Sequence, residues 1–125
     1  MIKTRPSNVN NKPYEVAEDS YLTLSNGDTY FIHEFYLTDY ASIPSVLKFF
    51  LEWKGQEADA YIVHDSLYHY QGYRTFRGSV LKKTKRKWAD KEMKWHMKRL
   101  GSPRWRYTLY YIAVRAFGWK SYGNV

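Results

Sequence analysis

The chain has 125 residues, no cysteine, a formal net charge of +8 and an aromatic fraction of 19%. This length suits one domain, and the lack of cysteine excludes a disulfide framework and a thiolate metal site. No run approaches the roughly 20 apolar residues of a membrane span, so we expect no transmembrane segment. The polar first residues also differ from a signal peptide. A basic, aromatic-rich surface suits nucleic acid, an anionic membrane surface or an acidic protein partner.

The first part of the chain favours strands. Residues 1–13 are polar and contain prolines and asparagines, so we expect an irregular N-terminal arm there. Tyr21–Leu24 and Thr29–Ile32 are rich in β-forming residues, and Asn26-Gly27 lies between them. Asn-Gly in this setting is typical of a tight hairpin. We expect the second strand to continue to Leu37.

The rest of the chain favours helices that end close to glycines. The expected ranges are about 44–53, 56–70, 84–100 and 103–117, with a loop over residues 73–83. On the last helix we expect Arg104, Arg106 and Arg115 to face solvent. The predicted fold is therefore α+β: an N-terminal β-hairpin or small antiparallel sheet followed by about four helices, with an antiparallel helix pair at the core. We expect a single domain over residues 14–120 and a tail over residues 121–125.

One ionisable pair, His64 and Asp65, lies inside an apolar, helix-forming run. The two side chains are about 100° apart on a helix, so both can border one pocket. If the next helix packs antiparallel, Asp90 can reach the imidazole of His64 and fix its tautomer, as a general base requires. The alternative is that these residues are polar groups at the edge of the core.

A basic run precedes and enters the third expected helix. Its members are Arg77, Lys82, Lys83, Lys85, Arg86 and Lys87. They could bind nucleic acid or an anionic surface, with Trp88 or Tyr73 available for stacking. Basic residues at a helix N-terminus are unfavourable for the helix dipole, which favours a role with a partner. The alternative is a solvated surface.

Four segments, taken in order, are similar to those of a known family. Thr38–Pro44, His64–Tyr68, Ala89–Asp90 and Ala113–Gly118 together resemble a largely phage-encoded family of proteins of unknown function, the domain numbered 1353. The resemblance covers roughly residues 14–120. It implies a bacteriophage or prophage origin, a shared α+β domain, other phage proteins as partners, and a location in the virion or the host cytoplasm.

A more distant resemblance concerns chemistry. The pattern His-Asp-x-x-Tyr on one helix, with Asp on an antiparallel helix, is similar to the core of secreted phospholipase A2 enzymes. It implies that His64 is the base that activates water, that Asp90 orients His64, and that Tyr68 hydrogen-bonds Asp90. By the same likeness Asp65 would be a calcium ligand, and Asp39 could be a second one. The chain departs from these enzymes in lacking their glycine-rich calcium loop and their disulfides.

Three functions follow from these patterns. The first is a structural or interaction module of a phage virion, or an accessory phage protein, built on the helix pair. The second is an envelope-directed, metal-assisted ester hydrolase that uses His64. The third is an accessory protein that binds nucleic acid through the basic run.

Overall fold

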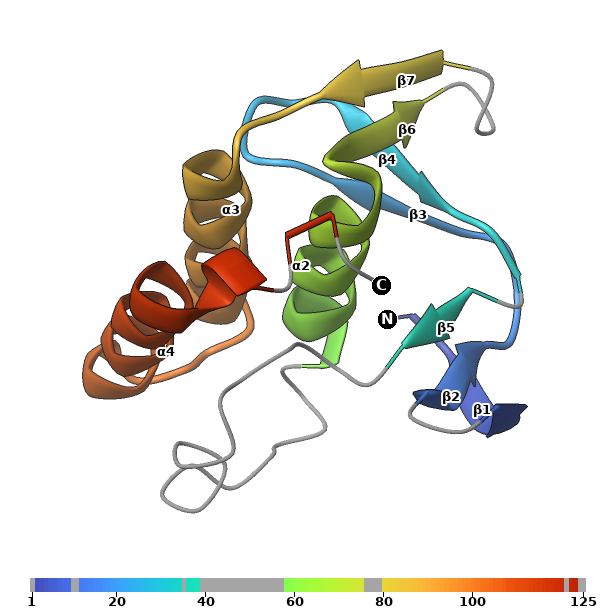
Figure 1. Cartoon of the computed structure of the whole chain (residues 1–125), viewed down its shortest axis with the longest axis horizontal. Helices are drawn as coiled ribbons and strands as arrows, with labels where there is room; N and C mark the ends of the chain where they lie inside the picture. Colours follow the sequence, from blue (N-terminus) through green and yellow to red (C-terminus); the bar gives the residue numbers. More distant parts are fainter. Residues whose placement is uncertain are drawn as a thin grey trace.

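The computed structural model describes residues 2–9, 12–34, 36–38, 58–75, 80–120 and 122–123. Over these residues the chain forms two antiparallel sheets and three α-helices, so the predicted α+β class is confirmed (Figure 1). The strands are β1 (Thr4–Val9), β2 (Lys12–Val16), β3 (Ser20–Thr23), β4 (Thr29–Ile32), β5 (Leu37–Thr38), β6 (Gly72–Thr75) and β7 (Val80–Lys83). The helices are α2 (Ala58–Tyr70), α3 (Arg86–Arg99), α4 (Arg104–Phe117) and the short 3-10 helix η3 (Gly118–Lys120). The helix expected over residues 44–53 lies outside the described residues.

The irregular arm expected over residues 1–13 is instead part of a three-stranded sheet with the order β1-β2-β5. A polar strand can form here because the backbone ladder and a few anchors stabilise it. Ile2 is buried, and its backbone N–H donates to Asp59 Oδ1 of α2 over 2.8 Å. Val16, at the end of β2, is also buried in the core. The polar composition of this segment therefore does not indicate disorder.

The hairpin predicted around Asn26-Gly27 is confirmed as β3 and β4. Gly27 has φ of +88°, a backbone conformation that glycine adopts without strain, and the Asn26 side chain accepts the backbone N–H of Asp28 over 3.0 Å. The expected continuation to Leu37 is wrong. The backbone N–H of Tyr36 donates to the carbonyl of His33, and this turn separates β4 from β5.

The loop expected over residues 73–83 is also wrong, because this stretch contains β6 and β7. These strands extend the hairpin into a four-stranded sheet with the order β3-β4-β6-β7. Gly72 allows their close approach, since a Cβ at this position would lie 2.3 Å from the carbonyl oxygen of Lys82. Gln71, with φ of +52°, makes the direct turn from α2 into β6.

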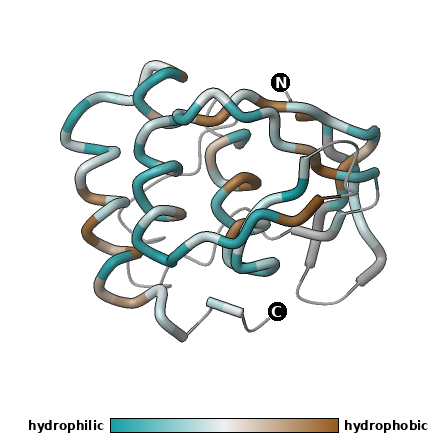
Figure 2. The backbone as a smooth tube through the Cα atoms, turned by 90° about the horizontal axis from the view of Figure 1, so that it is seen from above, coloured by the Kyte–Doolittle hydropathy of each residue, from teal (hydrophilic) through white to brown (hydrophobic). Residues whose placement is uncertain are grey.

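Helix α2 lies at the centre of the molecule. Every residue from Asp59 to Tyr68 is buried, and Figure 2 shows this helix, with both hydrophobic and hydrophilic stretches, between the other helices and the strands. Helices α2 and α3 run in opposite directions side by side, which confirms the predicted antiparallel pair (Figure 1). A helix buried on all sides must satisfy its polar side chains inside the protein. None of the described helices is both long and apolar enough to cross a membrane.

Candidate functional site

The carboxylate of Asp90, in the first part of α3, lies at the centre of a buried polar network. Its Oδ1 accepts the Tyr68 hydroxyl and lies 2.8 Å from Nε2 of His64. Its Oδ2 accepts Nη1 of Arg115 over 2.8 Å, and Nη1 of Arg86 lies 3.6 Å away. The Asp90 side chain itself is 0% exposed. We call these five residues the Asp90 network; it joins α2, α3 and α4.

Hydrogen bonds and charge keep Asp90 ionised in spite of its burial. Burial alone would raise the pKa of this carboxyl, but the hydrogen bond and charge of His64, followed by the bonds from Tyr68 and Arg115, bring the pKa below its ordinary value. The pKa of Tyr68 is raised, first by burial and then by its bond to Asp90. The phenol therefore stays protonated and donates to the carboxylate.

The two ring nitrogens of His64 have different surroundings. Because Nε2 faces a carboxylate, which is an acceptor, Nε2 carries a hydrogen. Nδ1 is buried and has no hydrogen-bond partner in the described part of the chain. A buried polar atom without a partner costs about 1–3 kcal/mol. In the neutral ring this Nδ1 holds a lone pair that can accept a proton.

Two arginines expected on the surface belong to this network instead. Arg86 donates to the carbonyls of Val114 and Arg115 over 2.8 and 3.2 Å, at the C-terminal end of α4. Its guanidinium therefore ties α4 to α3 and is not a free surface cation. Arg115 was expected to face solvent, but it bonds Asp90 while remaining partly exposed. Gly118 completes the packing, because a Cβ there would lie 2.6 Å from the Tyr68 hydroxyl.

Of the two residues predicted to bind calcium, only Asp65 lies among the described residues. Asp65 is buried and faces the strands, where it helps to raise the pKa of Tyr30 after the larger effects of burial and Tyr70. Asp39 lies outside the described residues. Within the described ranges no group of three or more His, Asp or Glu side chains could hold a metal ion.

A second buried histidine–carboxylate pair lies further along α3. His96 Nε2 is 3.3 Å from Glu92 Oε2, and both side chains are buried. The Ser25 hydroxyl and its backbone N–H donate to the same carboxylate, so Glu92 joins α3 to the β3–β4 turn. Sequence reasoning missed Glu92, although its four-residue spacing from His96 indicates a pair on one helix face.

Part of the predicted basic run lines a groove of about 540 Å³ at the junction of β7 and α3. We call it the lysine groove. It is lined by Asn26, Tyr73, Lys82, Lys83, Thr84, Lys85, Lys87, Trp88 and Lys91. The predicted residue Arg77 lies outside the described residues, and Lys91 was missed because it lies one helical turn beyond the run.

The fold and the site define an α+β domain in which three helices meet at a buried, ionised carboxylate. The family model described as "Protein of unknown function (DUF1353)" matches residues 14–114, and the chain belongs to this family. The search of curated proteins and the search of solved structures found no match.

The predicted contacts of His64 and Tyr68 with Asp90 are present. The catalytic roles assigned to these three residues stay predictions. Three of the four segments that carry the family resemblance meet at Asp90, because the last one contributes Arg115 and Gly118. That convergence makes the Asp90 network the candidate site of this domain.

Proposed function

We propose that this chain is a phage-encoded ester hydrolase in which His64 acts as a general base on water. The observation that supports this most is the asymmetry of the imidazole. Nε2 lies 2.8 Å from the ionised Asp90, while the buried Nδ1 has no partner among the described residues. An unpaired buried acceptor weakens the fold, so the position of Nδ1 beside the Asp90–His64 pair supports a role beyond stability.

The proposed reaction is the hydrolysis of an ester by an activated water. Water gives a proton to Nδ1 of His64, and its oxygen forms a bond to the ester carbonyl carbon. Asp90 holds Nε2–H and stabilises the positive charge that develops on the ring. The carbon–oxygen bond of the leaving group then breaks, and the proton on Nδ1 passes to the departing alkoxide. The products are a carboxylic acid and an alcohol.

The surface of the protein supports an ester of the cell envelope as substrate. Trp105 and Ile112 on the outer side of α4 are 61% and 57% exposed. Exposed tryptophan beside basic side chains suits the interface of an anionic bilayer. The net charge of +8 would attract such a surface at moderate salt.

The test compares His64→Gln with His64→Ala. The amide N–H of glutamine can still donate to Asp90, whereas glutamine offers no base at the position of Nδ1. We expect wild type to cleave p-nitrophenyl butyrate or phosphatidylglycerol in vesicles, and His64→Gln to lose about 100-fold or more of the rate while remaining folded. His64→Ala should lose both rate and stability.

Assays with added calcium and with EDTA would separate metal-dependent from metal-independent turnover. Wild-type protein without turnover under either condition, or His64→Gln with the wild-type rate, would rule out the proposal.

The second candidate is a structural or interaction module of a phage virion. What favours it is the complete burial of Asp90 and its bonding to side chains from two other helices, which suits a fixed connection between helices. In this case the protein would occur at a fixed copy number in purified phage particles. Quantitative mass spectrometry of such particles tests it, and absence of the protein from them would exclude it.

A further inference from the structure

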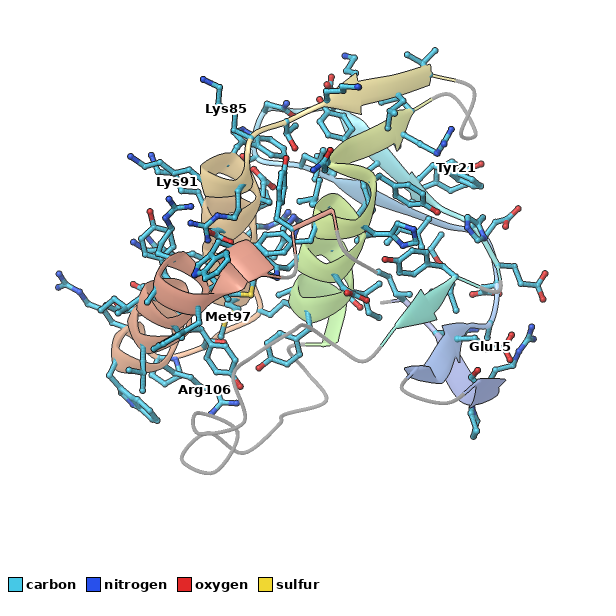
Figure 3. All side chains as sticks on the ribbon, viewed as in Figure 1. Glu15, Tyr21, Lys85, Lys91, Met97 and Arg106 are labelled. Carbon is cyan, nitrogen blue, oxygen red and sulfur yellow. The ribbon has the colours of Figure 1, made fainter. Side chains whose placement is uncertain are left out.

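The lysine groove gathers positive charge that the protein does not neutralise. Lys82 pairs with Asp28 over 3.0 Å. The other four lysines of the lining have no ion-pair partner in the part of the chain that the structure describes: Lys83, Lys85, Lys87 and Lys91. Figure 3 shows Lys85, just before α3, and Lys91, in the first half of α3, extending away from α2. The groove is therefore a concave surface with a strong positive potential.

This arrangement is unfavourable for the free protein. The first turn of α3 has no acidic residue and no side-chain cap, while Lys85 and Lys87 place positive charge at the positive end of the helix dipole. Lys87 and Lys91 are four residues apart on one helix, so they also repel each other. A negatively charged partner would relieve both effects.

Protection of a sheet edge explains only part of the cluster. Lys82 and Lys83 lie on β7, the edge strand of the four-stranded sheet, where lysine discourages pairing with another chain. Lys85, Lys87 and Lys91 lie beyond that strand, at the start and on the outer side of α3. Their position in the groove needs another reason.

Aromatic rings accompany the lysines. Trp88 lines the groove, and the ring of Tyr73 stacks against it with centroids 5.7 Å apart and planes 22° apart. Tyr73 is itself held by its hydroxyl, which donates to Asp28. A supported, partly exposed indole beside cations is the arrangement by which proteins hold unpaired bases and their phosphates. The indole of Trp88 lies in a groove and is only partly exposed, unlike that of Trp105, so it suits a base that enters the groove better than a flat bilayer surface.

We propose that the lysine groove binds single-stranded nucleic acid. The unpaired lysines contact phosphates, and a base stacks on Trp88. The groove and the Asp90 network have no residue in common, so this binding does not depend on the hydrolase activity. His64→Gln should therefore bind nucleic acid as the wild type does.

The test titrates a labelled 12-nucleotide oligothymidylate with the full chain and measures binding by fluorescence anisotropy. Lys91→Glu changes a groove residue, and Lys98→Glu is its matched control because it changes the same charge two turns further along the exposed side of α3. We expect Lys91→Glu to weaken binding by about tenfold and Lys98→Glu by less than about threefold. With about four phosphates bound, the logarithm of affinity should fall with the logarithm of salt with a slope of about −3.

Two further probes identify the ligand class. An abasic 12-mer, which has phosphates but no bases, should bind about tenfold more weakly than oligothymidylate. Equal binding of the two would overturn the proposal in favour of a site for any polyanion. If Lys91→Glu weakens binding to phosphatidylglycerol vesicles but not to oligothymidylate, the proposal is overturned in favour of a lipid site. The proposal is also overturned if Lys91→Glu and Lys98→Glu lose the same affinity for oligothymidylate, or if the wild type does not bind oligothymidylate at 50 mM salt.

Discussion

Asp90 and Lys91 are neighbours on α3, but their charged groups lie in opposite environments. The Asp90 carboxylate is fully buried and contacts His64, Tyr68 and Arg115. Lys91 is exposed in the lysine groove and has no ion-pair partner among the described residues. One helix thus carries a compensated charge on its inner face and uncompensated charges on its outer face.

The difference indicates what each face is for. A buried charge without partners destabilises a fold by several kcal/mol, so Asp90 must be surrounded by donors before the three helices can pack. An exposed lysine carries no such penalty and can remain unpaired until a partner arrives. We therefore expect changes at the Asp90 network to act on stability and changes at the lysine groove to act on binding.

The largest effect should come from Asp90→Ala. This change leaves His64 and the guanidinium groups of Arg115 and Arg86 without their common acceptor. We expect a loss of about 3–5 kcal/mol in the free energy of unfolding, measured by urea denaturation.

Asp28→Ala is the matched control. Asp28 also accepts a tyrosine hydroxyl and pairs with a cation, Lys82, but its side chain is 34% exposed. We expect the Asp28→Ala variant to lose about 1 kcal/mol or less in the free energy of unfolding. Similar losses for the two variants would contradict the argument from burial.

Protonation of Asp90 should weaken the fold in acid. Because its pKa is lower in the folded protein than the ordinary value of 3.8, its contribution is fully present above that value and is lost as the pH falls through the lower, folded value. The loss should be smaller than that of Asp90→Ala, since a neutral carboxyl keeps some hydrogen bonds.

Urea unfolding at pH 7 and at pH 3 measures this effect, with Asp90→Asn as reference. The variant lacks the titrating group and should lose less stability between the two pH values than wild type does. Equal losses of stability in wild type and Asp90→Asn would show that other carboxyls account for the destabilisation in acid.

Gly118→Ala should have a smaller effect that acts through Tyr68. Gly118 has φ of −70°, so alanine fits its backbone, but the new Cβ would lie 2.6 Å from the Tyr68 hydroxyl. Displacing the phenol from Asp90 should cost about 1–3 kcal/mol. In a Tyr68→Phe background, where that oxygen is absent, the same change should cost less, and a double-mutant cycle measures the difference.

Patterns of short range predicted much of this fold. Asn26-Gly27 marked the hairpin, and the glycines at 72, 101 and 118 lie at or just after the ends of α2, α3 and α4. The contact of His64 with Asp90 followed from helix spacing and one assumption, that the two helices pack antiparallel. The hairpin and the helix ends depend on neighbouring residues, which the sequence displays directly, whereas the His64–Asp90 contact also needed the assumed packing of the two helices.

The misses depend on tertiary contacts that local patterns do not encode. Gly72 was interpreted only as a helix stop, but it also allows β6 to approach β7. Strand β7 was not predicted because its lysines do not favour a strand. On α4, aromatic residues occupy several faces, so the pattern did not show that Arg106 is buried or that Arg115 reaches Asp90. Arg86 was assigned to the surface because it lies within a basic run.

The smallest expected effect separates stability from binding at a single residue. In Lys87→Glu the new carboxylate lies near the N-terminus of α3 and four residues before Lys91, so both the helix dipole and the side-chain pair become favourable. We expect a gain of about 0.3–1 kcal/mol in the free energy of unfolding. The same variant should bind oligothymidylate more weakly than wild type, since position 87 lies in the lysine groove.

Lys98→Glu again serves as the control, because its carboxylate lies at the unfavourable C-terminal end of α3 and outside the groove. It should gain no stability and keep most of its affinity. A Lys87→Glu protein that is both more stable and equally tight in binding would mean that the unpaired lysines serve no partner. A protein that loses affinity as it gains stability would show that this face of α3 gives up stability in order to bind.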